Sequence, residues 1–161
     1  MTIRPATADD IFSLLNLERQ CPTAAHWTEQ QYRQVFQRGV AGLMLVVEAS
    51  PSAASDSESG GDLVGFLVAR HLAPEWELEN IVVALTARRK GLGKRLLEAL
   101  LAAAHETNSD SVFLEVRESN AAARTFYVQA GFEQSGRRKA YYHFPTEDAV
   151  CMVRKLTDSP G

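Results

Sequence analysis

Apolar and polar residues along the chain form short blocks that predict a succession of strands and helices. Runs rich in Val, Ile, Leu and Phe predict strands at residues 2–7, 42–49, 63–72, 75–83, 111–118, 131–144 and 149–156. Apolar positions at helical spacing predict helices near residues 8–18, 28–36, 92–104 and 121–130. Because helices and strands alternate, we expect an α/β domain with a mixed sheet of five to seven strands and helices on both faces.

Polar residues at the expected helix ends support these boundaries. Thr7 is expected as an N-cap, and Asp10 favours the positive start of the helix that follows. In that helix, the apolar residues Ile11, Leu14 and Leu15 are expected to face inward, and the polar Glu18 is expected to face outward. Thr28 and Gln31 form a capping-box pattern, and Gly131 suits the position just past a helix end.

Residues 50–62, SPSAASDSESGGD, separate two of the predicted strands and hold no apolar residue larger than alanine. Such a segment has nothing to offset the entropy lost on ordering. We therefore expect a flexible hairpin connection, longer than a hairpin requires, and not a functional lid. The whole chain, 1–161, is expected to form a single domain.

Composition narrows the class of protein. The chain is 45% hydrophobic and 23% charged, and its net charge of −3 argues against a broad nucleic-acid surface. Cys21 and Cys151 show no metal-ligand spacing, so we expect no metal site; a single disulfide between them remains the alternative to free thiols. Unpaired thiols, no signal peptide and no long apolar run favour the reducing cytoplasm and no membrane attachment.

A basic, glycine-containing run follows the strand predicted at 75–83. Five basic residues fall within positions 88–95, among them Arg88, Arg89, Lys90 and Lys94, and an apolar helix pattern begins at Leu92. A strand that leads through a loop into a helix aims several backbone N–H groups at one point, where the helix dipole adds positive charge. Gly91 and Gly93 let a ligand come close to the backbone. The run therefore predicts a phosphate or pyrophosphate site.

Two common phosphate motifs are missing from this run. The Walker pattern is absent, and the dinucleotide fingerprint would need a glycine where the chain has Leu96. The plainer interpretation is a basic helix start that binds nothing. Positive charge at a helix start is unfavourable by roughly a few tenths of a kcal/mol per residue. This cost favours the interpretation in which an anion binds at this position.

The run RRKGLG after NIVVALTA resembles the acetyl-CoA pyrophosphate loop of the GCN5-related N-acetyltransferases. That family's pattern is Arg/Gln-x-x-Gly-x-Gly/Ala, and Arg88, Gly91 and Gly93 occupy its three positions. Further stretches, LEVRESNAAARTFYVQAGF, YYHFPTEDAVCM and HWTEQQY, are similar to the family's RimI-type enzymes, which acetylate the α-amino group of a ribosomal protein. The resemblance covers nearly the whole chain, with residues 50–62 as the one departure.

The resemblance implies a mixed sheet of six to seven strands in which two central parallel strands splay apart around acetyl-CoA. The backbone of Ile81, Val82 and Val83 would bind the pantetheine arm. The pyrophosphate would lie in the loop formed by Arg88, Arg89, Lys90, Gly91, Leu92, Gly93 and Lys94. Asn120 would contact the cofactor as well.

The resemblance also implies catalytic roles: Glu115 matches the proton acceptor of the RimI-type enzymes, and Tyr127 matches their proton donor. The chemistry is consistent with these roles, because acetyl transfer needs a neutral amine and a protonated thiol leaving group. An α-amine costs about 1 kcal/mol to deprotonate at pH 7, and a lysine about 4 to 5. Glu77 is the reserve candidate for the base, since more distant acetyltransferases place a glutamate near that point.

Taken alone, each of these residues has a plainer interpretation. Glu115 on the polar face of a strand suits a solvated or salt-bridged carboxylate, Tyr127 suits a core aromatic, and Asn120 suits an N-cap. Glu75, Glu77 and Glu79 form an acidic stripe on the strand 75–83, which either attracts a cationic peptide or is a solvated face.

Three functions are considered. We expect the first, which is transfer of an acetyl group from acetyl-CoA to the N-terminal α-amine of a ribosomal protein or another peptide, by a monomer that binds no nucleic acid. The alternatives are an acetyltransferase for a small amine or a lysine side chain, and a non-catalytic acyl-CoA-binding module. Tyr141, Tyr142 and the segment 26–32 favour the peptide, because peptide-acetylating members of the family frame their entrance with these regions.

Overall fold

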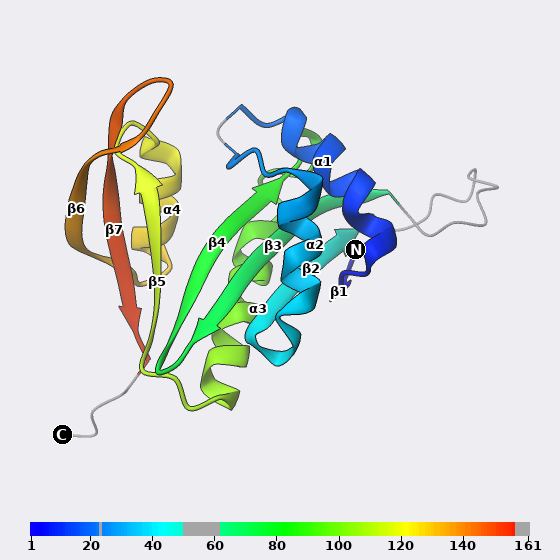
Figure 1. Cartoon of the computed structure of the whole chain (residues 1–161), viewed down its shortest axis with the longest axis horizontal. Helices are drawn as coiled ribbons and strands as arrows, with labels where there is room; N and C mark the ends of the chain where they lie inside the picture. The colour runs from blue at the N-terminus through cyan, green and yellow to red at the C-terminus, as the bar shows by residue number, and fades with distance from the viewer. Residues whose placement is uncertain (23, 50–61, 157–161) are drawn as a thin grey trace.

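The computed structural model describes residues 1–22, 24–49 and 62–156, which build a seven-stranded mixed sheet with helices on both faces (Figure 1). The strand order is β1-β2-β3-β4-β5-β7-β6, and only the β4–β5 pair is parallel among those that the structure describes. The strands are β1 (Thr2–Pro5), β2 (Gly42–Glu48), β3 (Leu63–Leu72), β4 (Glu75–Val83), β5 (Ser111–Arg117), β6 (Glu133–Tyr142) and β7 (Glu147–Lys155). The predicted α/β class and mixed sheet are confirmed.

Four α-helices cover the two faces of this sheet. One face carries α1 (Ile11–Arg19) and α2 (Glu29–Gln37), and the other carries α3 (Leu92–Glu106) and α4 (Ala121–Gln129) (Figure 1). Three short 3₁₀ turns, η1 (Ala8–Asp10), η2 (Gly39–Ala41) and η3 (Leu85–Ala87), connect these elements to their neighbours. None of the described helices is long and apolar enough to cross a membrane.

Two helix starts, those of α2 and α4, use the caps that the sequence predicts, whereas Thr7 precedes the turn η1 and its side chain caps no helix. Thr28 accepts a hydrogen bond from the Gln31 backbone N–H at 3.2 Å, and the Gln31 side chain accepts one from the Thr28 N–H at 2.8 Å. The Asn120 side chain likewise accepts from the N–H of Ala123 at 3.2 Å. At the far end of α4, Gly131 has φ +94°, a conformation that glycine adopts without strain.

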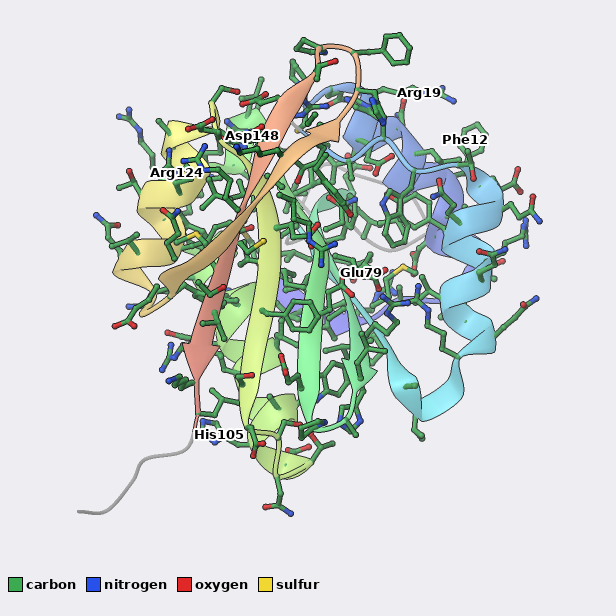
Figure 2. The ribbon with its side chains drawn as sticks, turned by 60° about the vertical axis from the view of Figure 1, so that its left-hand side comes forward. Phe12, Arg19, Glu79, His105, Arg124 and Asp148 are labelled. Atoms are coloured by element: carbon green, nitrogen blue, oxygen red, sulfur yellow. The ribbon has the colours of Figure 1, made fainter. Side chains whose placement is uncertain are left out.

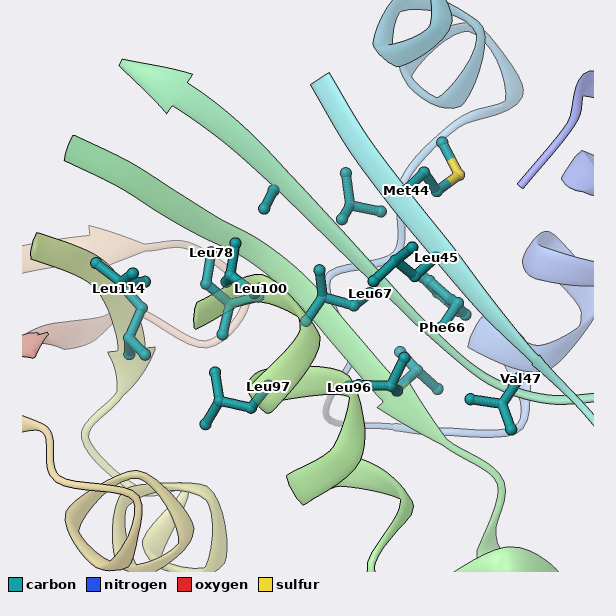
Figure 3. Close-up of a cluster of buried hydrophobic side chains, with 14 of the residues drawn as sticks. Met44, Leu45, Val47, Phe66, Leu67, Leu78, Leu96, Leu97, Leu100 and Leu114 are labelled. Atoms are coloured by element: carbon teal, nitrogen blue, oxygen red, sulfur yellow. The ribbon is translucent and has the colours of Figure 1, made fainter. Parts of the chain in front are cut away.

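The core lies between the sheet and α3. The apolar face of α3 buries Leu96, Leu97 and Leu100 against β3, β4 and β5 (Figure 3). Leu67 of β3 is fully buried at the same place, and its neighbour Phe66 is fully buried on the opposite face, where its ring centroid lies 6.0 Å from that of Tyr32 of α2. Because this helix begins directly after the predicted phosphate loop, burial of its apolar face also fixes the position of that loop.

The parallel pair β4–β5 separates part-way along its length. Glu75 to Leu78 pair with Ser111 to Leu114, and beyond these residues the two strands have no common ladder. Both strands nevertheless continue, β4 to Val83 and β5 to Arg117, and they diverge toward their carboxyl ends (Figure 1). The predicted pair of splayed central strands is therefore confirmed.

A β-bulge lies at the point where the splay begins. Val68 of β3 pairs with Asn80, and Ala69 pairs with Leu78, so that Glu79 has no partner on β3. A bulge increases the local twist and bends the strand that contains it. We infer that this extra residue turns β4 away from β5.

The segment that was expected to form a hairpin connection, 50–62, lies outside the described residues apart from Asp62. Its ends do belong to adjacent antiparallel strands: Glu48 of β2 pairs with Leu63 of β3, and the Ala49 N–H donates to the Asp62 carbonyl at 2.9 Å.

The packing of α3 leads to a prediction about stability. Leu100→Ala removes a fully buried side chain beneath the splay and should lower the free energy of unfolding by about 2 to 5 kcal/mol. Leu85→Ala is the matched control: Leu85 is 62% exposed, and its loss should change stability by less than about 0.5 kcal/mol. Chemical denaturation measures both, and equal effects of the two substitutions would contradict this account of the core.

Candidate active site

A cavity of about 1370 Å³ occupies the region where β4 and β5 diverge. Its walls come from β4, β5, α4, the loop before α3, the segment between α1 and α2, and the β6–β7 hairpin. Every predicted site residue except Lys90 lines it: Ile81, Val82, Val83, Arg88, Arg89, Gly91, Leu92, Gly93, Lys94, Glu115, Asn120 and Tyr127. Residues that were selected from four separate stretches of sequence thus meet in one place.

The loop from Arg88 to Lys94 has the geometry of an anion site. Gly91 has φ +74° and immediately precedes α3, while Arg89 also has a positive φ of 65°. The first N–H groups of a helix have no carbonyl partner within that helix. The backbone N–H groups of Leu92, Gly93 and Lys94, together with the positive end of the helix dipole, therefore offer a site for a phosphate.

Basic side chains surround this loop, and they differ in what they contact. Arg88 donates from Nε to the Val83 carbonyl at 3.2 Å, which ties the loop to the end of β4. Lys94 lies 4.0 Å from Glu98 in an exposed pair one helical turn apart, an interaction of little energy. Lys90 belongs to the same loop but does not line the cavity.

The two glycines of the loop meet different constraints. A Cβ on Gly91 would have nothing within 4 Å, so that the positive φ alone restricts this position. A Cβ on Gly93 would lie 3.4 Å from Cζ of Phe126, a ring of α4 that also lines the cavity. An alanine-sized side chain at Gly93 would thus reach ordinary van der Waals contact with Phe126, and a larger one would take up space between this ring and the cavity.

The final residues of β4 present a free backbone edge to the cavity. Ile81 and Val82 pair with Leu67 and Phe66 of β3 on one side. On the other side the ladder to β5 has already ended, at Leu78, and no other described strand takes its place. An extended, amide-containing ligand can pair with such an edge.

Glu115 lies on β5 with its carboxylate in the cavity and 17% of its side chain exposed. Arg138 of β6 forms an ion pair with it, with 2.8 Å between Nε of Arg138 and Oε1 of Glu115. Tyr141, at the end of β6, interacts with the same carboxylate, and this interaction raises the pKa of the tyrosine above its ordinary value. The plainer interpretation of Glu115 as a salt-bridged carboxylate is thus correct in part, and its partner is Arg138.

Tyr127 of α4 borders the cavity from a nearly buried position. Its ring packs against Phe126 and Phe132, with ring centroids 5.3 and 5.7 Å away. Burial raises the pKa of its phenol well above the ordinary value, and Tyr142 contributes less. The hydroxyl therefore keeps its proton throughout the neutral pH range and is available as a donor.

Arg117 organises the β6–β7 hairpin at the cavity entrance. Its guanidinium lies 4.3 Å from the ring centroid of Tyr142 and 3.3 Å from a carboxylate oxygen of Glu147. It also donates to the carbonyls of Pro145 and His143. Burial, followed by Glu115, raises the pKa of Tyr142 to about 12. These contacts fix the position of an aromatic side chain at the entrance.

The acidic stripe of β4 is not a simple solvated face. Glu77 and Glu79 line the cavity, and each forms an ion pair, Glu77 with Arg70 at 2.7 Å and Glu79 with Arg38 at the end of α2. Figure 2 labels Glu79, which lies on the side of the sheet that faces α2. Glu75, the third member, does not line the cavity.

The model of the GNAT acetyltransferase family matches residues 11–132, which include β4, the loop, α3, β5 and α4. The chain belongs to the GNAT acetyltransferase family. Its enzymes transfer an acetyl group from acetyl-CoA, so that the predicted acetyl donor and the predicted N-acyltransferase activity are confirmed. Among the described residues, no group of three His, Cys, Asp or Glu side chains is placed to hold a metal ion.

Curated relatives of this GNAT chain include N-terminal acetyltransferases. The ribosomal protein bS18-alanine N-acetyltransferase of Escherichia coli K12 is 38% identical over 101 residues, 60% of this chain and 67% of that protein. The N-alpha-acetyltransferase RimI of Mycobacterium tuberculosis is 37% identical over 106 residues, 63% of this chain and 65% of the relative.

Solved structures extend the likeness to nearly the whole chain. The ribosomal-protein-S18-alanine N-acetyltransferase of Escherichia coli superposes with a TM-score of 0.79 and 26% identity, covering 98% of this chain and 95% of that one. Ard1 from Thermoplasma volcanium gives a TM-score of 0.83 at 26% identity, covering 98% of both chains. The expected GNAT fold and its RimI-type resemblance are confirmed.

Two features of the site were missed from the sequence. Arg138 pairs with Glu115 across β7, a contact that no spacing along the chain indicates. Glu18, expected on a polar outer face, is buried instead. A signal for Glu18 was present, because it follows Leu14 by four residues and so belongs to the buried stripe of α1.

The loop geometry predicts how cofactor affinity responds to Gly93. Gly93→Val adds bulk between the cavity and Phe126 and should weaken CoA binding at least about tenfold, as measured by calorimetry. Gly136→Val is the control, because a Cβ on this β6 glycine meets no atom within 4 Å and the residue does not line the cavity. Thermal denaturation checks that both variants are folded. An unchanged CoA affinity for Gly93→Val would refute the placement of the cofactor in this loop.

Proposed function

We propose that this enzyme transfers the acetyl group of acetyl-CoA to the N-terminal α-amine of a protein, with a ribosomal protein as the first acceptor to test. The observation that supports this most strongly is the single cavity between the splayed strands, which joins the basic loop at one end to Glu115 and the tyrosines at the other. The relatives named as N-terminal acetyltransferases support the same choice of acceptor.

The donor is proposed to lie along the free edge of β4. Its pyrophosphate would take the N–H groups of the Arg88–Lys94 loop, and its pantetheine amides would pair with the backbone of residues 81–83. This arrangement brings the thioester toward the bulge at Glu79, where the β4–β5 ladder ends. Asn120 caps α4 in this structure, and we propose that it also borders the donor.

The acceptor is proposed to enter between the segment that precedes α2 and the β6–β7 hairpin. Trp27 lines one side of that entrance, and Tyr141 and Tyr142 line the other. Aromatic side chains on rigid elements can enclose an extended peptide at low entropic cost. A peptide that entered here would bring its amine to Glu115.

Glu115 and Tyr127 are proposed to divide the proton transfers. Glu115 accepts a proton from the amine, whose nitrogen then attacks the thioester carbonyl. The carbon–sulfur bond breaks as the amide forms, Tyr127 donates a proton to the departing thiolate, and the resulting phenolate takes up the second proton that the acylated nitrogen releases. Glu77, the reserve candidate for the base, forms an ion pair with Arg70 in the same cavity.

A peptide screen tests the acceptor class. Peptides that differ in their first residues, each also containing an internal lysine, are incubated with acetyl-CoA, and mass spectrometry locates the acetylated nitrogen. We expect acetylation at the α-amine, because it costs about 1 kcal/mol to deprotonate at pH 7 and a lysine costs about 4 to 5. Acetylation confined to lysine side chains, or no turnover at all, would contradict the proposal.

The proton pathway predicts different pH responses for two variants. Glu115→Gln should lower turnover by roughly two to four orders of magnitude at neutral pH, and alkaline pH should restore part of it because more of the amine is then neutral unaided. Tyr127→Phe should also slow the reaction, but alkaline pH should not restore it, because the wild-type phenol keeps its proton over this range. The pH–rate profiles of both variants are the measurement.

Glu77→Gln serves as the comparison for these profiles, since Glu77 is also a cavity glutamate that pairs with an arginine. It should retain at least about a tenth of wild-type turnover at neutral pH. If Glu77→Gln loses activity while Glu115→Gln keeps it, the base lies on β4 and the assignment to Glu115 is wrong.

A further inference from the structure

A carboxylate that the proposed mechanism does not use is buried behind the acceptor end of the cavity. Glu18 of α1 is 2% exposed. Its Oε1 accepts hydrogen bonds from the Trp27 backbone N–H at 3.1 Å, from the Asn80 side-chain amide at 2.9 Å and from the Tyr32 hydroxyl at 2.5 Å. Three donors converge on one oxygen, an arrangement that suits an ionised carboxylate.

The charge of Glu18 has no counter-ion. Within residues 1–22, 24–49 and 62–156, no basic side chain forms an ion pair with it. Burying an unpaired carboxylate is costly, and neutral donors offset only part of that cost. A buried charge kept at such a cost is a candidate for a role in function.

The carboxylates that line the cavity are in the opposite situation. Each of them forms an ion pair with a basic side chain: Glu77 with Arg70, Glu79 with Arg38, Glu98 with Lys94, Glu115 with Arg138 and Glu147 with Arg117. Within each pair, the basic side chain offsets part of the charge of the glutamate. Of the carboxylates described at this end of the cavity, Glu18 is therefore the one whose negative charge has no basic side chain as a partner.

The bulge in β4 connects Glu18 to the cavity. In a regular strand, consecutive side chains point to opposite faces. Here Glu79 reaches Arg38 at the end of α2, and its neighbour Asn80 reaches Glu18 and Tyr32, so that two successive residues contact the same helical layer. Asn80 and Trp27 both line the cavity, and both donate a hydrogen bond to Glu18. Glu18 is therefore separated from the cavity by a single layer of residues.

We propose that Glu18 is a specificity-determining positioning residue, whose uncompensated charge makes the acceptor end of the cavity selective for a cationic amine. The inference rests on the proposed function, since it concerns the amine end of the acceptor. An α-amine, with a pKa of about 8, arrives at neutral pH mostly as an ammonium ion. A fixed negative potential behind a wall of low dielectric concentrates such an ion at the site.

Binding of two matched peptides measures this selectivity directly. One peptide begins with alanine, and the other has the same sequence with the α-amino group replaced by hydrogen. Both peptides make the same contacts with the walls of the cavity. Their dissociation constants are measured by calorimetry at pH 7 on enzyme saturated with CoA. The ratio of the two constants then reports the attraction of the site for the ammonium group. The wild-type enzyme should prefer the amine peptide.

Glu18→Gln keeps the size of the side chain and one acceptor oxygen but removes the charge. We expect it to lower the preference for the amine peptide about tenfold. Tyr32→Phe removes one donor and keeps the charge, and Glu29→Gln alters an exposed glutamate of α2 that does not line the cavity; both should keep the preference within about twofold. If Glu18→Gln weakens both peptides equally, Glu18 only supports the wall and the inference is wrong.

A further variant tests the inference even if Glu18→Gln does not fold. The double substitution Glu79→Gln and Arg38→Gln removes one cavity ion pair without changing the net charge. The preference for the amine peptide should then persist within about twofold. Its loss would assign the selectivity to Glu79 and overturn the inference. A wild-type enzyme that binds CoA but neither peptide would instead count against the proposed function.

Discussion

The early end of the β4–β5 ladder is the constraint on which the rest of the structure depends. Two parallel strands that pair only from Glu75 to Leu78 leave a backbone edge and a cavity in the centre of a sheet. A seven-stranded sheet tolerates this opening because β3 still holds β4 on one side, and β7 holds β5 on the other. The helices α3 and α4 support the two halves from behind and meet at Gly93 and Phe126. Gly93 thus lies where the loop, α3 and α4 meet beside the cavity.

The same opening explains how the charges are arranged. Backbone N–H groups, a helix start and basic side chains gather at one end of the cavity, where an anion suits them. Toward the other end, glutamates from β4 and β5 are held by arginines from β3, β6 and the end of α2. Pairing fixes these carboxylates in place and reduces their field, so that the buried Glu18 can influence which acceptor is preferred.

Tyrosines have different surroundings according to their position in the cavity. Tyr127 is enclosed by α4 and neighbouring aromatic rings, and burial raises its pKa, so that the hydroxyl stays protonated at neutral pH. Tyr141 and Tyr142 lie at the end of β6, where Glu115 and Arg117 contact them and the hairpin is held by Glu147. In the proposed mechanism, different tyrosines of this domain therefore serve proton transfer and acceptor binding.

The sequence by itself determined the elements, the caps at Thr28 and Asn120, the basic loop with its two glycines and the resemblance to the acetyltransferase family. Periodicity and capping depend on residues within one or two helical turns of each other, which a single sequence displays directly. Only the tertiary structure decided that Arg138 pairs with Glu115, that the extra residue of β4 is Glu79, and that Glu18 is buried beside Asn80 and Trp27. Each of these facts joins residues from different elements, and the register and packing that bring them together result from burial of the whole core.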